Sequence, residues 1–307
     1  MSPSGFETDY ACPGDSTALA LIRREGRGAQ TQLFAGFERS DRWSSPAMPA
    51  PVRQIVARGG RSWWLTPAAV HESRDGGLTS QEMPLPNGAQ AVLAAGEDGP
   101  LVAVGAQVLA HEGDVWGAFW ELPAPLVDEK VSALIAMGRE VLVMTNRLRI
   151  FRGAGGDRSL RDFSAGLPPP LSGGAYQTLN VRRLGDWYLG YAGRLYLRHA
   201  EDSSWKPADA SAPNELRGVV ESHSPDWVAA PWARAVWIGH DGTKLLTSGP
   251  GLSLESLWSP PTGAPQIVKR LVAGKETVMA SFRRATRDLS GVTITQGIAE
   301  AVRLPVS

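Results

Sequence analysis

The chain has 307 residues, of which 43% are hydrophobic, so it can bury a core and is not a disordered chain. Lys and Arg together number 31, and so do Asp and Glu. This zero net charge argues against a general binder of nucleic acid or of membrane surfaces, because such partners require a basic excess.

Cysteine content and the N-terminal sequence indicate the compartment. One cysteine, Cys12, cannot form an intrachain disulfide, and no cysteine cluster is available for zinc. The N-terminal residues lack the basic start and apolar stretch of a secretory signal, and no apolar run is long enough to span a bilayer. We therefore expect a cytoplasmic protein with neither a membrane nor a nucleic acid as partner.

Prolines recur along the chain at nearly regular intervals. Representative positions are Pro49, Pro86, Pro125, Pro169, Pro213, Pro260 and Pro305. The successive steps of 37, 39, 44, 44, 47 and 45 residues are close to the length of one β-propeller blade. Proline cannot donate to a central strand ladder, so these segments are expected to connect strands or blades.

Short runs rich in Val, Ile, Leu, Trp and Tyr fill each interval and predict strands. In the first three units they lie at 6–10, 16–26, 30–40 and 42–48; at 52–60, 61–66, 68–73 and 78–86; and at 91–99, 100–105, 106–114 and 115–123. In the next three they lie at 131–138, 139–145, 146–157 and 160–168; at 176–185, 186–191, 192–203 and 204–210; and at 216–225, 226–231 and 233–243, with a tail near 256–258. The last unit has runs at 266–274, 275–282, 291–297 and 299–305.

Four short strands in each of seven units predict an all-β fold, a seven-bladed β-propeller of antiparallel sheets forming one domain over residues 1–307. The expected blades are residues 6–51, 52–88, 89–126, 127–171, 172–214, 215–262 and 263–307. Six or eight blades are the alternatives within this fold. The last unit looks complete by itself, which leaves open whether the ring closes through a shared blade.

One turn carries a recognisable motif. Residues 73–79 read Ser-Arg-Asp-Gly-Gly-Leu-Thr, which matches S-x-D-x-G-x-T and resembles the Asp-box, or BNR repeat, of sialidase-like propellers. The resemblance implies a turn between the third and fourth strands of a blade. Ser73 and Asp75 would bond turn amides, Gly77 would supply a positive φ, and Thr79 would pack the turn. Residues 37–43 and 199–205 look like weaker copies.

Four of the five histidines follow the repeat. His71, His111, His199 and His240 are separated by 40, 88 and 41 residues, so we place them in four blades, each at the turn from the third strand to the fourth. Strand ends in separate blades diverge, so these side chains are not expected to converge on a metal. No metal or other cofactor is predicted.

Catalytic motifs are not assignable. A sialidase needs an arginine cluster, a tyrosine–glutamate pair and an acid aspartate, and the chain has Leu-Ile-Arg-Arg-Glu-Gly at 21–26 where that family has Arg-Ile-Pro. No tyrosine–glutamate pair can be placed, and no phosphate-binding loop, nucleophile elbow or zinc-protease motif occurs. The catalytic residues are therefore unknown.

The leading functional hypothesis is a non-enzymatic binding or scaffold propeller, such as an inhibitor or immunity-like protein. It would engage a protein through the face that carries the connections from second to third strands and from blade to blade. Two of these connections look long, at 231–234 and 283–288. Arginine and tryptophan are enriched in interface hot spots, so the expected contacts are Trp232, Arg234, Arg283, Arg284 and Arg287.

The alternative is an enzyme, a lyase, cyclase or hydrolase, that acts on a small polar ligand in the central funnel. Charged residues expected on inner strands motivate it, namely Arg182, Arg183, Glu221, Lys269 and Arg270.

Overall fold

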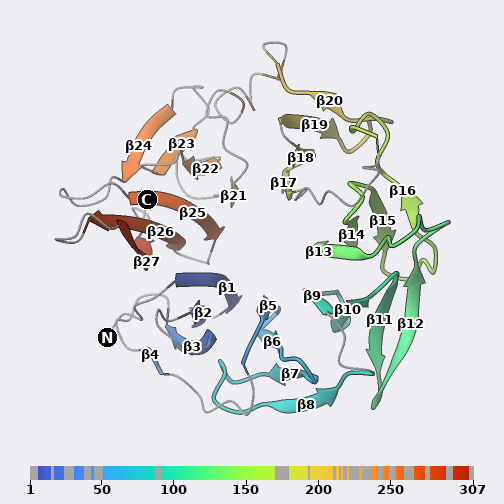
Figure 1. Cartoon of the computed structure of the whole chain (residues 1–307), viewed down its shortest axis with the longest axis horizontal. Helices are drawn as coiled ribbons and strands as arrows, with labels where there is room; N and C mark the ends of the chain where they lie inside the picture. The colour runs from blue at the N-terminus through green and yellow to red at the C-terminus, as the bar shows by residue number, and fades with distance from the viewer. Residues whose placement is uncertain are drawn as a thin grey trace. The chain divides into compact units, whose positions relative to one another are not determined.

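The computed structural model describes the backbone and side chains of residues 51–86, 91–169, 181–192 and 194–209. Elsewhere it describes the backbone of the strands given below and a few single residues (Figure 1). The chain divides into two compact units, residues 49–207 and residues 1–48 with 208–307. Among the described residues, no helix has the length and apolarity needed to cross a bilayer.

Residues 49–207 form four sheets, each with four antiparallel strands that follow one another in chain order. The first two sheets are β5 (Gln54–Arg58), β6 (Arg61–Leu65), β7 (Ala69–Ser73) and β8 (Gln81–Pro84); and β9 (Ala91–Ala95), β10 (Pro100–Val104), β11 (Gln107–Glu112) and β12 (Val115–Glu121). The next two are β13 (Val131–Met137), β14 (Glu140–Thr145), β15 (Ile150–Ala154) and β16 (Arg161–Asp162); and β17 (Asn180–Leu184), β18 (Trp187–Tyr191), β19 (Leu195–His199) and β20 (Lys206–Pro207).

Tight hairpins join the first two strands of these sheets. Gly138 and Gly185 occupy the β13–β14 and β17–β18 turns with φ of 61° and 60°. Two-residue hairpin turns need this left-handed conformation, which glycine adopts without steric cost. Within this unit the first strands β5, β9 and β13 lie next to one another, and each sheet extends outward to its fourth strand (Figure 1).

The core of residues 49–207 lies between adjacent sheets. The cluster between the β9–β12 and β13–β16 sheets includes Leu101, Val108 and Trp120 on one side and Val141 and Phe151 on the other. Trp120 is 2% exposed, and Gly153 on β15 leaves the space for its indole ring. A sheet of four strands cannot bury both faces alone, so this packing against a neighbour is what stabilises each sheet.

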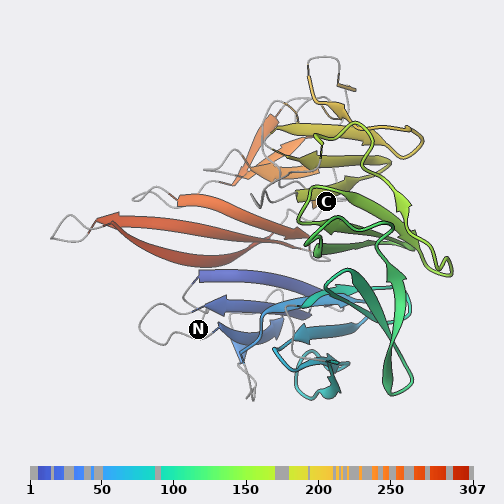
Figure 2. The same ribbon diagram turned by 45° about the vertical axis from the view of Figure 1, so that its right-hand side comes forward.

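Residues 1–48 and 208–307 form three further sheets of described strands. They are β1 (Phe6–Gly14), β2 (Thr17–Arg23), β3 (Thr31–Phe37) and β4 (Trp43–Ser44); β21 (Val228–Ala229), β22 (Trp237–His240), β23 (Leu245–Ser248) and β24 (Leu254–Trp258); and β25 (Gln266–Ala273), β26 (Thr277–Arg287) and β27 (Thr293–Arg303). Within this unit β1 contacts β25, β26 and β27 (Figures 1 and 2). Among the described strands, the N-terminal and C-terminal sheets share none.

The last sheet differs from the sequence prediction. The runs 291–297 and 299–305 form a single strand, β27, so the described sheet has three strands instead of four. Arg283, Arg284 and Arg287 were predicted in a loop but lie within β26. The ladder continues through them because β27 is equally long, and it pairs Arg287 with Thr293.

Three of the four repeat histidines lie on the third strands β7, β11 and β19, within the ladder or at its end and not in the turn to the fourth strand where they were predicted. Each packs against a tryptophan. His71 stacks on Trp64 with ring centroids 5.9 Å apart, and His111 and His199 meet Trp116 and Trp187 edge-on at 4.9 Å. Burial lowers the pKa of His71, which favours the neutral, packed imidazole.

His240 was misplaced by the sequence analysis. It ends β22, the second strand of its sheet, because the sheet begins at β21, which was predicted to be the second strand. The segment 231–234 lies outside the described residues, and the strands on either side of it in the chain are β21 and β22.

The turn from β7 to β8 is closed by its own side chains. The Ser73 hydroxyl accepts from the Gly77 amide at 2.9 Å and donates to Asp75 at 2.8 Å. The Asp75 carboxylate accepts from the Thr79 amide at 2.9 and 3.0 Å. Gly76 and Gly77 have φ of 71° and 91°. Hydrogen bonds from the hydroxyl and amide of Thr79, and from Ser73, lower the pKa of Asp75 from 3.8 to about 2.

This lowered pKa predicts an acid-sensitive contribution to stability. The turn stabilises the fold fully above the ordinary aspartate pKa and loses this contribution as pH falls through the folded value of about 2. Because Asp75 is exposed, screening should limit the effect to about 1 kcal/mol. Urea unfolding from about pH 4 down to pH 2 should therefore show a steeper loss for the wild type than for Asp75→Asn. Parallel curves would contradict the assignment.

A second prediction concerns the inter-sheet core. A Cβ atom at Gly153 would lie 2.6 Å from the Trp120 ring, which is closer than packed atoms approach. Gly153→Ala should reduce the free energy of unfolding by about 3 kcal/mol, the upper range for overpacking. Gly117→Ala on β12 is the matched control because nothing lies within 4 Å of its added methyl group. Equal denaturation midpoints for the two variants would refute this packing.

Candidate functional site

Two connections at one end of the β9–β12 and β13–β16 sheets are joined by hydrogen bonds. One runs from β12 to β13 (residues 122–130), and the other runs from β14 to β15 (residues 146–149). The Asn146 side chain donates to the Asp128 carbonyl at 3.1 Å and accepts from the Lys130 amide at 2.9 Å. We call residues 122–130 and 145–149 the Glu129 cluster.

The centre of this cluster is the carboxylate of Glu129, whose side chain is fully buried. One oxygen accepts from the Thr145 hydroxyl at 2.7 Å. The other accepts from the Leu126 amide and from the Arg149 guanidinium, both at 2.8 Å. A buried carboxylate is tolerated when it is paired and hydrogen-bonded in this way, so Glu129 fixes the first connection against the second.

Two arginines hold the backbone of the first connection. Arg149 donates to the carbonyls of Pro123 and Ala124, both at 3.2 Å, and its guanidinium lies 4.6 Å from the Phe151 ring centroid. Arg147 donates to the Val127 carbonyl at 2.9 Å. Carbonyls along the exposed connection are thus bound by groups that extend from the β14–β15 connection, which restricts its motion.

The cluster also concentrates unusual backbone geometry. Among the described residues, the three non-glycine positions with positive φ are Ala124 at 43°, Asp128 at 58° and Leu148 at 62°. All three lie in the Glu129 cluster. Such conformations are costly for residues with a Cβ, and they persist where surrounding contacts enforce them, often at functional sites.

The first connection displays two apolar side chains to solvent. Leu126 is 44% exposed and Val127 is 82% exposed. The carbonyls of Ala124 and Val127 accept hydrogen bonds from Arg149 and Arg147, which hold the backbone that carries these side chains. Because Glu129 is fully hydrogen-bonded, the arrangement suits the presentation of apolar side chains to a partner better than it suits proton transfer.

The predicted funnel residue Arg183 is used within the fold. Its guanidinium lies 3.5 Å from Glu140 and 3.9 Å from Asp186, and 5.4 Å from the Tyr188 ring centroid. Burial opposes ionisation of Glu140, but hydrogen bonds from Tyr188 and Arg152 and the nearby guanidinium charges lower its pKa overall. The neighbouring Arg182 is half-buried and faces the other side of the sheet.

The other predicted residues are not brought together by the described structure. Lys269 and Arg270 lie on β25, and Arg283, Arg284 and Arg287 lie on β26, all with side chains outside the described part. Glu221, Trp232 and Arg234 fall entirely outside the described residues. Their roles stay predictions. Within the described side chains, no group of His, Cys, Asp and Glu could hold a metal ion.

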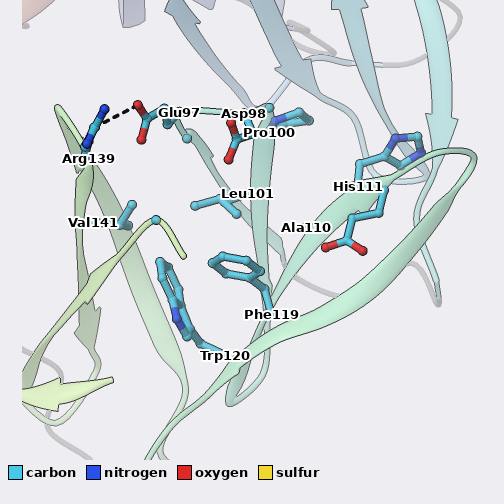
Figure 3. A pocket seen from close by; sticks show the side chains of 14 residues that line it. Glu97, Asp98, Pro100, Leu101, Ala110, His111, Phe119, Trp120, Arg139 and Val141 are labelled. Atoms are coloured by element: carbon cyan, nitrogen blue, oxygen red, sulfur yellow. Dashed lines mark hydrogen bonds and ion pairs between the residues drawn. The ribbon is translucent and has the colours of Figure 1, made fainter. Parts of the chain in front are cut away.

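A pocket opens at the opposite end of the same two sheets, beside the β9–β10 and β13–β14 turns (Figure 3). Its cavity volume is about 90 Å³. Leu101, Phe119 and Trp120 form apolar walls, and Glu97 and Asp98 lie on the rim. This end also carries the turns from third to fourth strands, where the sequence placed structural motifs instead of a binding site.

Sequence reasoning missed the Glu129 cluster. It predicted adjoining strands at 139–145 and 146–157, but β15 begins at Ile150, so residues 146–149 form a connection. The available signal was the charged Asp128-Glu129-Lys130 triplet directly before a strand, followed some twenty residues later by two arginines. Only the fold shows that these charges meet.

Comparisons with known proteins identify the fold and not the family. No family model and no curated protein matches the sequence. YCF48 bound to D1 peptide aligns with a TM-score of 0.62 and 13% identity, over 95% of each chain. YCF48 from Cyanidioschyzon merolae aligns with a TM-score of 0.57 and 10% identity, over 97% of this chain and 96% of that one. YCF48 is a β-propeller.

The chain folds as a β-propeller. The all-β class predicted from the sequence is confirmed by the antiparallel sheets and by these similar structures. The described strands form seven sheets, which is consistent with seven blades.

The Glu129 cluster generates a prediction about stability and local order. Glu129→Gln removes the charge that faces Arg149 and should lower the free energy of unfolding by about 3 kcal/mol. It should also speed hydrogen exchange of the Leu126 amide, which donates to Glu129. Glu121→Gln is the control because Glu121 is exposed and accepts only an exposed hydrogen bond from Gln107. Unchanged Leu126 exchange would contradict this role.

Proposed function

We propose that this chain is a non-enzymatic binding protein that engages a protein partner through the Glu129 cluster. The observation that carries the proposal is a rigid connection that displays Leu126 and Val127 at 44% and 82% exposure. These residues lie on a connection between blades, at the end of the sheets where the sequence analysis expected a partner. An inhibitor, immunity-like protein or scaffold would use such a surface.

The free energy of binding favours contact through Leu126 and Val127. Each apolar side chain of this size contributes about 1.5–3 kcal/mol when fully buried in a partner. A connection that is already held by Glu129, Arg147 and Arg149 loses little conformational entropy on binding, so more of that contribution remains as affinity.

A similar structure gives independent support of a general kind. YCF48, the propeller aligned above, is bound to D1 peptide, so a propeller with a similar fold accommodates a polypeptide ligand. By contrast, Arg183, which was predicted to line the funnel, is already paired with Glu140, and this pairing weakens the alternative of an enzyme acting through it.

We also propose a cytoplasmic location and membership of the Asp-box superfamily. The hydrogen bonds of the Ser73–Thr79 turn support the superfamily.

The test requires a ligand selected on the whole chain. Peptides from a random displayed library would be selected on the purified protein, and their dissociation constants measured by fluorescence anisotropy. Val127→Asp should weaken binding at least about tenfold, because a charge cannot be buried in an apolar contact. Val115→Asp is the matched control, since Val115 is 67% exposed at the far end of β12. Equal affinities for both variants would overturn the proposal.

A further inference from the structure

The pocket at the other end of the β9–β12 and β13–β16 sheets has fixed aromatic walls (Figure 3). Phe119 and Trp120 lie edge to face with ring centroids 4.5 Å apart. The Trp120 indole N–H donates to the Asp157 carbonyl at 2.7 Å, which fixes the ring. Leu101 and Val141 complete the apolar interior. The walls are therefore formed before any ligand arrives.

Three carboxylates lie around the pocket, and two of them are paired with arginines. Glu97 pairs with Arg139 at 3.2 Å, and Glu112 pairs with Arg158 at 3.3 Å. Among the described contacts, the Asp98 carboxylate has no hydrogen-bonding or charged partner, and Figure 3 shows it directed toward Leu101 and the aromatic rings. One carboxylate beside the apolar cavity is thus left for a ligand, which favours a cation.

The side chain of Arg158 already places a guanidinium group against Phe119 and Glu112, two residues that line the pocket. Its guanidinium carbon lies 4.7 Å from the Phe119 ring centroid while the group pairs with Glu112. The side chains of Arg158 and Glu112 are 63% and 65% exposed, so water and salt weaken the pair and a ligand can compete with it. An aromatic ring next to a carboxylate is a recurrent site for arginine, whose flat and weakly hydrated group stacks on rings.

The size of the cavity limits the ligand to a small group. A volume of about 90 Å³ corresponds to about four non-hydrogen atoms, when a cavity of about 150 Å³ that holds benzene is the guide. A guanidinium group has four non-hydrogen atoms. A whole metabolite does not fit, because such ligands occupy pockets of about 300 Å³ or more.

We propose that this pocket binds a guanidinium group, that of an arginine side chain in a polypeptide or of a free guanidino compound. The site is independent of the Glu129 cluster and lies at the opposite end of the same sheets. The Asp98 carboxylate pairs with the guanidinium, and the half-buried Phe119 ring packs against its face, next to the buried Trp120.

The direct test is a titration of the full chain with Nα-acetyl-arginine-N-methylamide, followed by the indole N–H signal of Trp120 in NMR spectra. Trp120→Phe identifies that signal. Binding should be weak, with a dissociation constant of about 1 mM, because the ligand buries few atoms. The citrulline analogue, which has the same shape without the charge, should bind at least about tenfold more weakly. Equal affinities for the two analogues would overturn the proposal.

Variants test the assigned groups. Asp98→Asn combined with Glu112→Gln should weaken arginine binding about tenfold, and Arg158→Ala should strengthen it about threefold by freeing Glu112 and Phe119. Asp114→Asn is the control, since it changes charge at an exposed turn that does not line the pocket. A loss with Asp114→Asn equal to that of the double variant would refute the assignment.

A parallel titration with free arginine distinguishes the two sources of the guanidinium group. Tighter binding of the capped residue indicates a polypeptide ligand, and tighter binding of free arginine indicates a free guanidino compound.

Discussion

Each sheet of residues 49–207 depends on burying a face against the next sheet. A single four-stranded sheet leaves two apolar faces exposed to water, and burial removes that cost at about 25 cal/mol per Å² of apolar surface. In the best-described interface, Trp120 of one sheet fills the space beside Gly153 of the next. This contact sets the separation of β12 from β15, and hence the positions of the chain segments that leave both ends of these sheets.

Both candidate sites follow from that separation. At one end, the connections that leave β12 and β14 approach closely enough for Glu129 to reach Thr145 and Arg149. The desolvation of a buried carboxylate is offset by this set of partners, which favours the conformation of the connection that supplies them. At the other end, the two sheets leave a shallow cavity over Trp120, and the β9–β10 turn brings Asp98 to its rim.

Much of the strand arrangement was predictable because each strand is a local pattern. Short, continuously buried runs such as Arg61–Leu65 and Glu140–Thr145 end in glycine or polar turns, and the predicted Ser73–Thr79 turn is closed by residues at most four apart. The long strand β27 was predicted as two because its glycine, Gly297, resembled a turn signal, although it continues the ladder opposite Arg283.

The sites were not predictable from the same patterns. Glu129 and Arg149 are 20 residues apart in the chain, yet their side chains are hydrogen-bonded. The charged residues 128–130 follow two prolines, a pattern that predicts an exposed loop, whereas the Glu129 side chain is buried. The pocket is lined by Gly155, which carries no side chain, and Gly153 gives space to the Trp120 ring that forms a wall. Long-range contacts of this kind require the packed fold.

Methyl NMR with a bound peptide can show whether the Glu129 cluster is the surface that meets a partner. Four large apolar residues are well exposed in the described part of the chain: Leu78, Val115, Leu126 and Val127. Saturating the protons of a bound, library-selected peptide should reduce the methyl signals of Leu126 and Val127 most strongly. If the methyl signals of Leu78 or Val115 fall while those of Leu126 and Val127 persist, the partner binds elsewhere and the proposed role of the Glu129 cluster is wrong.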